Sequence, residues 1–261
     1  MTAVHPTAIV DKSAKLGENI TIGAYSIVEA EVTIGDGTWI GPHVVIRNFT
    51  TIGKDNRIFQ FCSIGEAPQH QGYAGEPTKL VIGERNTIRE YCTINRATAN
   101  GPDHLATTKI GNDNFIMAYA HIAHDCVLGD HIIFANGASL AGHVDIGDYA
   151  ILGGFSLVHQ FCKIGQHCIT GIGCVCLQDV PPYIVAAGNP GKPFGINSKG
   201  LRRRNFSEQS IKRLNQAYRV VYRRRLNLQS AINEVEKMNG NHAEVITFSA
   251  FLRHSKRGII R

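Results

Sequence analysis

Four histidines and one aspartate are the residues of this sequence with the clearest capacity for chemistry. His121, His124 and Asp125 stand close together, and His143 and His159 follow further along the chain. Histidine acts as a general base near neutral pH, especially when a carboxylate orients it, and it also ligates zinc. Two chemistries therefore remain open at this point, acyl transfer with a histidine base and zinc-dependent hydration. Which of them applies depends on the elements that position these side chains.

The sequence that carries these residues follows a six-residue repeat. An apolar residue recurs at every sixth position over 4–64, and glycine often comes directly after it. The same spacing resumes over 82–94 and over 110–164, and Thr170 and Cys176 continue it in weakened form. A period of six matches neither the 3.6-residue turn of an α-helix nor the two-residue alternation of a simple strand.

A coil with three flat faces, one hexapeptide per face and three hexapeptides per turn accounts for this period. The apolar side chain of each face points inward, and small residues such as glycine allow the corners. Successive coils stack with parallel-strand spacing, about 4.8 Å per turn. The repeat therefore predicts a mainly β chain, a parallel β-helix of hexapeptide repeats in which each coil buries its neighbour.

Coil arithmetic brings the four histidines together. The inward residues beside them are Ile122, Leu140 and Val158, which are three hexapeptides apart and so stack on one face of three successive coils. Each histidine lies within three positions of one of these residues. The histidines are therefore expected to gather along one edge of the solenoid, one to two coil spacings apart. His131 and His167 belong to a different face.

Two polar segments with glycine and proline interrupt the repeat, at about 66–79 and 96–108. Both are predicted to leave the coil stack as loops, because irregular segments rich in turn residues run over protein surfaces. The repeat ends near residue 180, and a turn-rich stretch at 186–197 follows. We therefore predict a β-helix domain over residues 1–190.

The last part of the chain changes to a helical period. Apolar residues recur at intervals of three and four after Ser207, which is a favourable N-cap. Two further helices are predicted at about 228–238 and 243–253, on either side of an Asn-Gly-Asn break. Residues 191–261 are thus predicted to form a small basic α-helical domain that covers the open last coil.

The charge of the chain is divided unevenly between these two parts. Residues 192–261 hold 16 Lys+Arg and 4 Glu, a net charge of +12, which leaves −6 for residues 1–191 out of the total of +6. A basic segment attracts an acidic partner. No nucleic-acid-binding motif accompanies it, so nucleic acid is not expected to be that partner.

The composition also bounds the location of the protein. No apolar run reaches the length of about 20 residues that a membrane span needs, so stable membrane insertion is not expected. The first residues show no signal-peptide pattern, and the seven cysteines are expected to be buried, reduced thiols. These observations favour a cytoplasmic protein.

Several motifs resemble those of the bacterial UDP-N-acetylglucosamine O-acyltransferases, and the resemblance covers essentially the whole chain. The hexapeptide repeat alone is shared by many acyltransferases, whereas the motifs around the histidines and near the C-terminal end are more specific. They are HIAHDC at 121–126, LAGHV at 140–144, VHQF at 158–161, QDVPPY at 178–183 and PFGIN at 193–197, with YAGEPT at 73–78 and RGIIR at 257–261.

The resemblance implies a reaction and an assembly. The family moves an (R)-3-hydroxyacyl group from acyl carrier protein to the glucosamine 3-hydroxyl of UDP-N-acetylglucosamine, the first step of lipid A biosynthesis. It also implies left-handed coils and a homotrimer whose sites lie between adjacent subunits. Neither a cofactor nor a metal is implied.

The resemblance also implies roles for individual residues. His124 is similar to the family's general base, Asp125 to the carboxylate that orients it, and the backbone N–H of Gly142 to a donor facing the developing oxyanion. The arginines suit a nucleotide because their planar guanidinium groups fit phosphate oxygens. Substrate contacts are implied for His121, His143, His159, Gln160, Gln69, Asn197, Arg203 and Arg204.

One position aligns with the residue that limits acyl chain length in this family. Ile172 stands there, and because an isoleucine side chain fills several methylene volumes, we predict a preference for shorter acyl donors than long-chain members use. The sequence departs from the family pattern at His70, Gly72, Asn95 and Lys199. These departures leave open an amino group instead of a hydroxyl at the sugar 3-position.

Three other functions remain as alternatives. A zinc-dependent hydratase on the same scaffold would require stoichiometric metal. A non-enzymatic trimeric scaffold would have no use for His124. A nucleotide-sugar N-acyltransferase would share the donor, but that family usually has an additional N-terminal domain for which there is no room before Val4.

Overall fold

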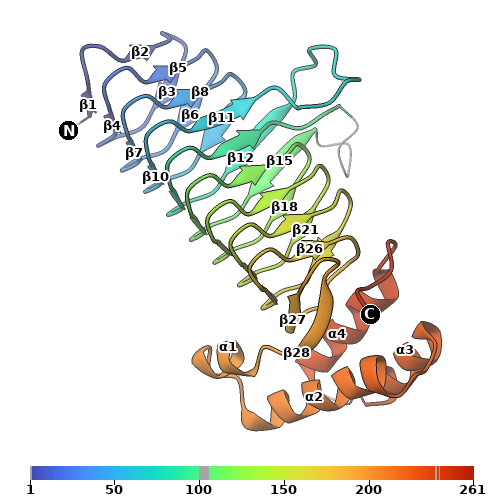
Figure 1. Ribbon diagram of the computed structural model, residues 1–261. Coiled ribbons are helices and arrows are strands. Elements are labelled where there is room, and N and C mark those ends of the chain that lie inside the picture. The colour runs from blue at the N-terminus through green and yellow to red at the C-terminus, as the bar shows by residue number, and fades with distance from the viewer. Residues whose placement is uncertain (1, 100–105, 239, 241) are drawn as a thin grey trace.

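The chain forms the β-helix that the repeat predicts. The computed structural model describes residues 2–99, 106–238, 240 and 242–261. Short parallel strands wind into a left-handed coil stack, and a group of helices lies at its C-terminal end (Figure 1). The sheet register pairs Ile122 with Leu140 and Leu140 with Val158, so the predicted turn of three hexapeptides is confirmed.

Each face of the coil contributes one sheet. Within the described residues the first sheet has 11 strands: β1 (Ala3–Val4), β4 (Thr21–Ile22), β7 (Trp39–Ile40), β10 (Arg57–Ile58), β13 (Thr87–Ile88), β16 (Phe115–Ile116), β19 (Ile133–Phe134), β22 (Ile151–Leu152), β25 (Ile169–Thr170), β27 (Ile184–Ala187) and β28 (Lys192–Ile196). The second sheet contains β2 (Ile9–Val10), β5 (Ile27–Val28), β8 (Val45–Ile46), β11 (Ser63–Glu66), β14 (Thr93–Asn95), β17 (His121–Ile122), β20 (Ser139–Leu140), β23 (Leu157–Val158) and β26 (Val175–Cys176). The third contains β3 (Lys15–Leu16), β6 (Thr33–Ile34), β9 (Thr50–Ile52), β12 (Lys79–Ile82), β15 (Thr107–Ile110), β18 (Val127–Leu128), β21 (Asp145–Ile146) and β24 (Lys163–Ile164).

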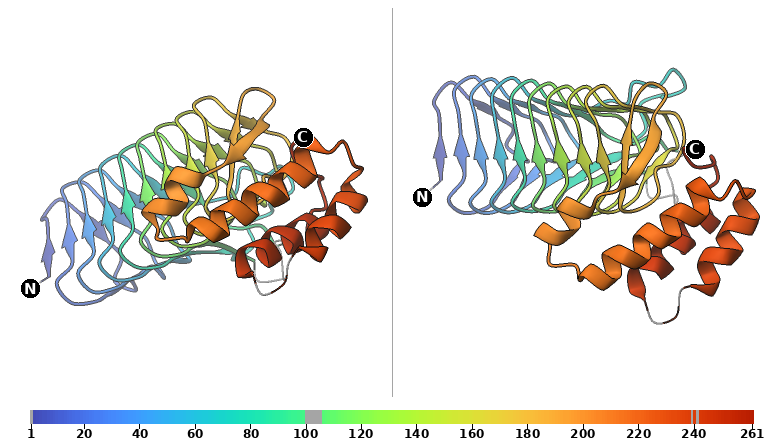
Figure 2. Two further views of the ribbon diagram at one scale, coloured as in Figure 1. Left: turned by 90° about the horizontal axis from the view of Figure 1, so that it is seen from below. Right: turned by 60° about the horizontal axis from the view of Figure 1, so that its bottom comes forward.

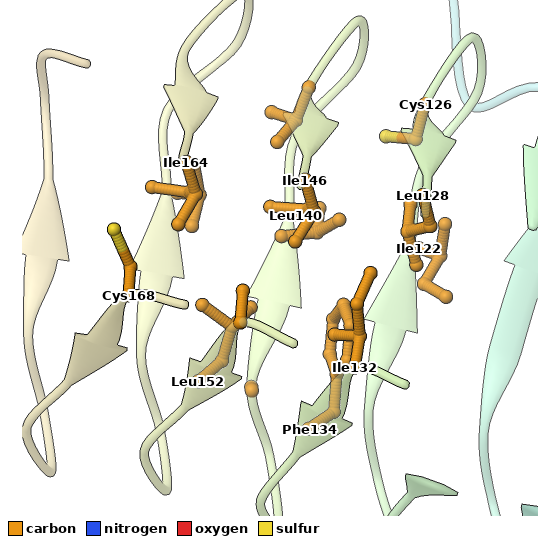
Figure 3. Packing of buried hydrophobic residues seen from close by; sticks show 14 of the residues in the cluster. Ile122, Cys126, Leu128, Ile132, Phe134, Leu140, Ile146, Leu152, Ile164 and Cys168 are labelled. Atoms are coloured by element: carbon orange, nitrogen blue, oxygen red, sulfur yellow. The ribbon is translucent and has the colours of Figure 1, made fainter. Parts of the chain in front are cut away.

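The inward residues of the three sheets form one continuous apolar core. Figure 3 shows how side chains from different faces, such as Phe134, Leu140 and Ile146, converge inside the coil. All seven cysteines are buried in this core or against it and form no disulfide, as expected. The first coil is an exception, since Val4 is 41% exposed because no coil lies beneath it.

The corners of the coil require unusual backbone. At many corners a residue adopts a positive φ, which is costly for residues other than glycine. Asp125, His143 and Phe161 occupy this position in three successive coils, with φ of 62°, 61° and 64°. Because the same conformation repeats from coil to coil, their side chains form a column along the corner.

Both predicted loops interrupt the coil stack where expected. Residues 67–78 connect β11 to β12, so the first loop is one residue shorter at each end than predicted. The second loop follows β14 and ends where β15 begins at Thr107. Its residues 100–105 lie outside the described part of the chain.

The stretch at 186–197 differs from its prediction as turn-rich chain. Most of it forms an antiparallel hairpin of β27 and β28, and β27 extends the first sheet in parallel with β25. The many glycine and proline residues of this stretch are typical of turns, so the sequence gives no strand signal for the hairpin. The domain boundary predicted after residue 190 falls between the two strands of the hairpin.

Four helices complete the described chain: α1 (Ser198–Arg203), α2 (Glu208–Arg223), α3 (Leu228–Lys237) and α4 (Ala243–His254). Ser207 caps α2 by accepting a hydrogen bond from the N–H of Ser210, as predicted, whereas α1 had no sequence signal. The helices gather below the last coils (Figure 2), where α2 packs on β28. In the part of the chain that the structure describes, none of the helices has the length and apolarity needed to traverse a bilayer.

A stack of rings lines the corner between the third sheet and the first. Tyr149 lies between His131 and His167, with ring centroids 4.6 and 4.9 Å away, and Tyr183 follows His167 at 5.7 Å. The guanidinium of Arg204 lies over Tyr149, 4.8 Å from its centroid. Burial, helped by the charge of Arg204, lowers the pKa of His167 to about 4.

This low pKa predicts a pH-dependent stability. An unfolded histidine titrates near 6.5, so between pH 6.5 and 4 the unfolded chain binds the proton more readily. The free energy of unfolding should therefore decrease as the pH is lowered through this window, by up to about 3 kcal/mol from His167. In His167→Phe, which keeps the ring stack, urea unfolding at pH 7 and pH 4.5 should show a smaller loss. An equal loss in both proteins would contradict the assignment.

Candidate active site

His124 and Asp125 form a buried pair at the corner between β17 and β18. The Nδ1–H of His124 donates to Oδ2 of Asp125 at 2.7 Å, and the two residues are 8% and 0% exposed. Because an ionised carboxylate only accepts hydrogen bonds, this contact places the histidine proton on Nδ1. The Nε2 atom therefore keeps its lone pair and is available as a base.

The second loop holds the Asp125 carboxylate in place. The hydroxyl of Thr98 donates to Oδ2 at 2.8 Å, and the backbone N–H of Thr98 donates to both carboxylate oxygens at 3.1 and 3.2 Å. The backbone N–H of Asp125 donates to the hydroxyl of Thr108 on β15. Burial opposes ionisation of this carboxyl, but the hydrogen bonds from His124 and Thr98 outweigh it and hold its pKa below the usual value. Asp125 is thus a fixed negative charge behind His124.

His143 stands one coil further on, beside the same carboxylate. Its Nε2 lies 3.5 Å from Oδ2 of Asp125, and its ring stands perpendicular to that of His124 with centroids 5.3 Å apart. Phe161, from the next coil, stacks on the other side at 4.5 Å. The charge of Asp125 raises the pKa of His143, but burial lowers it by more, so the neutral ring is favoured.

Gly142 lies directly against the imidazole of His124. A side-chain carbon at this position would come within 2.5 Å of Cε1 and 2.8 Å of Nε2 of that ring, so only glycine fits. The Gly142 carbonyl accepts from the Phe161 N–H at 3.1 Å, whereas none of the backbone hydrogen bonds in the described residues uses the Gly142 N–H.

His121 and His159 flank this pair at different depths. His121 lies on β17, and its Nδ1 is 2.7 Å from the Thr93 hydroxyl. Burial lowers the pKa of His121. His159 is exposed after β23, where Nη2 of Arg257 approaches its Nδ1 at 3.3 Å. Gln160 is exposed beside it. The structure thus brings the predicted histidines to one edge, with His159 at its rim.

The first loop returns over this edge. His70 lies against His124, with ring centroids 5.4 Å apart and nearly perpendicular planes, and Gln69 is exposed next to it. Arg96 fastens the loop: its guanidinium donates to the Gly65 carbonyl at 2.9 Å and to the Tyr73 hydroxyl at 3.0 Å. The position of His70 therefore depends on an arginine outside the loop.

A cavity of about 490 Å³ lies beside these rings. Its lining includes His70, Thr98, His143 and Phe161, together with Arg257 from the C-terminal segment. Sequence reasoning did not place His70, Thr98 or Arg257 here, because loops and the tail have no register with the coils. Phe161, in contrast, follows His143 by one full coil and could have been found by the coil arithmetic.

The remaining predicted site residues lie elsewhere on the chain. Asn197 is buried and caps α1, with its side-chain amide donating to the His167 carbonyl at 2.9 Å. Arg203 is exposed at the end of α1, and Arg204 covers Tyr149. These three residues belong to the corner with the ring stack, and the structure of one chain does not bring them to His124.

Ile172 projects from a third corner, before β26. Its side chain is 86% exposed. Ala118 occupies the same corner and precedes His121 by three residues. Ile172 lies three coils beyond Ala118, and three coil spacings correspond to roughly 14 Å along the solenoid. The outward face of the second sheet, including the 48% exposed Leu157 on β23, lies between the two positions.

Similar sequences and structures occur in known proteins. A family model described as domain 2 of UDP-N-acetylglucosamine O-acyltransferase matches residues 179–260, and a model of six bacterial transferase hexapeptide repeats matches residues 107–142. The acyl-[acyl-carrier-protein]–UDP-N-acetylglucosamine O-acyltransferases of Thiobacillus denitrificans and Halorhodospira halophila are 50% and 52% identical to this chain over the full length of both partners. The chain belongs to the UDP-N-acetylglucosamine O-acyltransferase family.

Solved structures of the family agree with the fold. LpxA from Acinetobacter baumannii superimposes with a TM-score of 0.96 at 45% identity, and the enzyme from Moraxella catarrhalis gives 0.96 at 44%, each over 99% of both chains. The predicted family, the fold class and the assignment as an acyltransferase are therefore confirmed.

The fastening of the first loop by Arg96 can be tested without an activity assay. In Arg96→Ala, amide hydrogens of residues 67–78 should exchange at least about tenfold faster, because a hydrogen bond to a charged group contributes about 1.5–3 kcal/mol. Arg57→Ala, which removes an exposed arginine from β10, is the matched control and should leave this exchange unchanged. Unchanged exchange in Arg96→Ala would show that other contacts hold the loop.

Proposed function

We propose that this protein transfers an (R)-3-hydroxyacyl group from acyl carrier protein to the glucosamine 3-hydroxyl of UDP-N-acetylglucosamine. Full-length identity of about 50% to enzymes named for this donor and acceptor supports the substrates. The observation that carries the mechanism is the buried His124–Asp125 pair, whose free Nε2 lies beside Gly142. On this basis the protein catalyses the first step of lipid A biosynthesis in the cytoplasm.

In this mechanism His124 is the general base. Its Nε2 takes the proton of the sugar hydroxyl as the oxygen attacks the thioester carbonyl carbon, and the negative charge moves to the carbonyl oxygen. The Gly142 N–H donates a hydrogen bond to that oxygen. When the tetrahedral intermediate collapses, the carbon–sulfur bond breaks and the protonated His124 returns the proton to the leaving thiolate of the carrier.

Asp125 stabilises the charged intermediate form of His124. Hydrogen bonds from Thr98 and from His124 itself keep the Asp125 carboxylate ionised. A negative charge therefore faces the His124 ring while that ring carries the extra proton. The reaction needs no metal and no cofactor for these steps. His121, His143, His159, Gln160 and Gln69 surround the base or its rim and are proposed to contact the substrates.

The site is proposed to be completed by a second copy of the chain in a homotrimer. Asn197, Arg203 and Arg204 lie on a different corner from His124, so one chain cannot present both groups to a single nucleotide sugar. A neighbouring copy supplies the missing corner if the coils pack side by side. The exposed ring ladder of Tyr25, His43, Phe61, Tyr91 and Tyr119 offers apolar surface for such a contact.

The basic C-terminal part fits the acidic acyl carrier protein. Its net charge is +12 over residues 192–261. Some of its arginines are already paired, such as Arg202 with Glu208 and Arg253 with Glu236. The excess of positive charge remains and is proposed to steer the carrier to the enzyme.

The reaction and the base can be tested together. Purified protein, UDP-N-acetylglucosamine and a panel of (R)-3-hydroxyacyl carrier proteins should give a monoacylated nucleotide sugar, read by mass spectrometry. His124→Ala should lower kcat by about 10²–10⁴-fold, because a general base contributes this much. His5→Gln, an exposed histidine in the first coil, is the control and should keep wild-type activity.

Two results would contradict this proposal. Full activity of His124→Ala would exclude this residue as the base. Absence of product with every donor would exclude UDP-N-acetylglucosamine as the acceptor. Acylation of the 3-amino analogue of the sugar would then show that the acceptor group is an amine. Sedimentation of the protein at three times the chain mass would support the trimer, and a monomer would oppose it.

The exposed side chain at position 172 is proposed to end the acyl groove. A chain that starts at His124 and follows the outward face of the second sheet reaches Ile172 after roughly 14 Å along the axis. Removing the side chain in Ile172→Gly should shift the preferred donor to longer acyl chains, measured as kcat/KM over the donor panel. Ile246→Ala, which removes an exposed apolar side chain from α4, is the control. An unchanged profile in Ile172→Gly would reject this assignment.

A further inference from the structure

We propose that the base itself lies in an inhibitory zinc site, formed by His124, Asp125 and His143 with His70 as the fourth ligand. One potential ligand atom of each of the first three residues lies within 4.8 Å of the others. Among the described residues, this is the one group of three or more His, Cys, Asp or Glu side chains with that property. The site goes beyond the proposed acyl transfer, whose steps use no metal.

Two of the distances between ligand atoms can be compared with those around a tetrahedral ion. Zinc bonds of about 2.0–2.1 Å set neighbouring ligand atoms of a tetrahedron about 3.3 Å apart. Nε2 of His143 lies 3.5 Å from Oδ2 of Asp125, which is close to this edge. Nδ1 of His124 lies 2.7 Å from the same oxygen, so this contact must lengthen by roughly 0.6 Å to admit the ion.

His70 can supply the fourth ligand from the first loop. Its Nδ1 accepts a hydrogen bond from the Gly72 N–H at 3.1 Å, so the Nε2 side of the ring is the one that can bind an ion. The ring faces His124 at a centroid distance of 5.4 Å and lines the same cavity as His143. Because the His70 side chain is exposed, it can rotate toward the ion while the contacts of Arg96 with the loop and the coils stay in place.

The surroundings already hold the other ligands as a metal site requires. The backbone N–H and the hydroxyl of Thr98 donate hydrogen bonds to the Asp125 carboxylate, and Phe161 fixes the plane of the His143 ring by stacking on it. Such outer contacts orient ligands and raise metal affinity. The cavity of about 490 Å³ beside His70 and His143 gives the ion a route from solvent.

Binding of zinc at this place is incompatible with base catalysis. The ion binds Nδ1 of His124, so the ring's single proton moves from Nδ1 to Nε2 and the lone pair that acts as the base is lost. The ion also binds the carboxylate oxygen that orients the ring. His124 then has no negative partner to stabilise the imidazolium. Metal binding and acyl transfer therefore exclude one another.

Metal binding is tested directly with Co²⁺ as a spectroscopic substitute for zinc. The metal-free wild-type protein should bind one Co²⁺ per site with the intense visible absorption of tetrahedral coordination, and one equivalent of Zn²⁺ should remove that absorption. His70→Gln should weaken Zn²⁺ binding at least about tenfold, and His143→Gln should weaken it further. His131→Gln, on the ring-stack corner, should bind as the wild type does.

The outcomes are separable from those of the acyl transfer assay, because absorption and competition with a fluorescent chelator do not depend on turnover. Wild-type protein that shows no tetrahedral Co²⁺ spectrum overturns the proposal. Equal Zn²⁺ affinity in the wild type and His70→Gln also overturns it, since His70 lies on the surface and its loss leaves the coils intact. In an active preparation, Zn²⁺ should inhibit the wild type and inhibit His70→Gln only at a concentration at least about tenfold higher.

Discussion

The stacking of each coil on the next at a fixed offset of three hexapeptides is the interaction on which the rest of the structure depends. It pairs the strands, closes the apolar core and repeats each corner conformation. Asp125, His143 and Phe161 face one another only because three coils place the same costly positive φ in register. The backbone strain of a single corner is tolerated because neighbouring coils hold it, and the column of polar and aromatic side chains is a result of that repetition.

The sequence predicted those parts of the site that share this register. His121, His124, Asp125 and His143 were assigned to one edge by counting in whole coils, and the helices after Ser207 followed from their own period. Residues in segments without a period could not be placed. Thr98 reaches Asp125 from a loop, and Arg257 comes from the tail, so only tertiary contacts determine their positions.

The hairpin of β27 and β28 shows a different limit of sequence reasoning. Its glycine and proline residues are typical of turns. The extended backbone is nevertheless favoured, because β27 pairs with β25 and β28, and β28 packs against α2. Asn197 illustrates the same point for function. The family resemblance implies a substrate contact for it, but nothing in the sequence signals that its side chain also donates to the His167 carbonyl and caps the start of α1.

The two ends of the solenoid are not equivalent. At the C-terminal end the antiparallel hairpin and the helices cover the last coil, whereas at the other end β1, β2 and β3 are the edge strands of their sheets, and Ile9 is 65% exposed. An object with two open edges can polymerise head to tail, as sheet edges in fibres do. With one end closed, edge pairing can join two solenoids head to head and then stops, so the C-terminal cap protects this repeat protein from unlimited fibre growth.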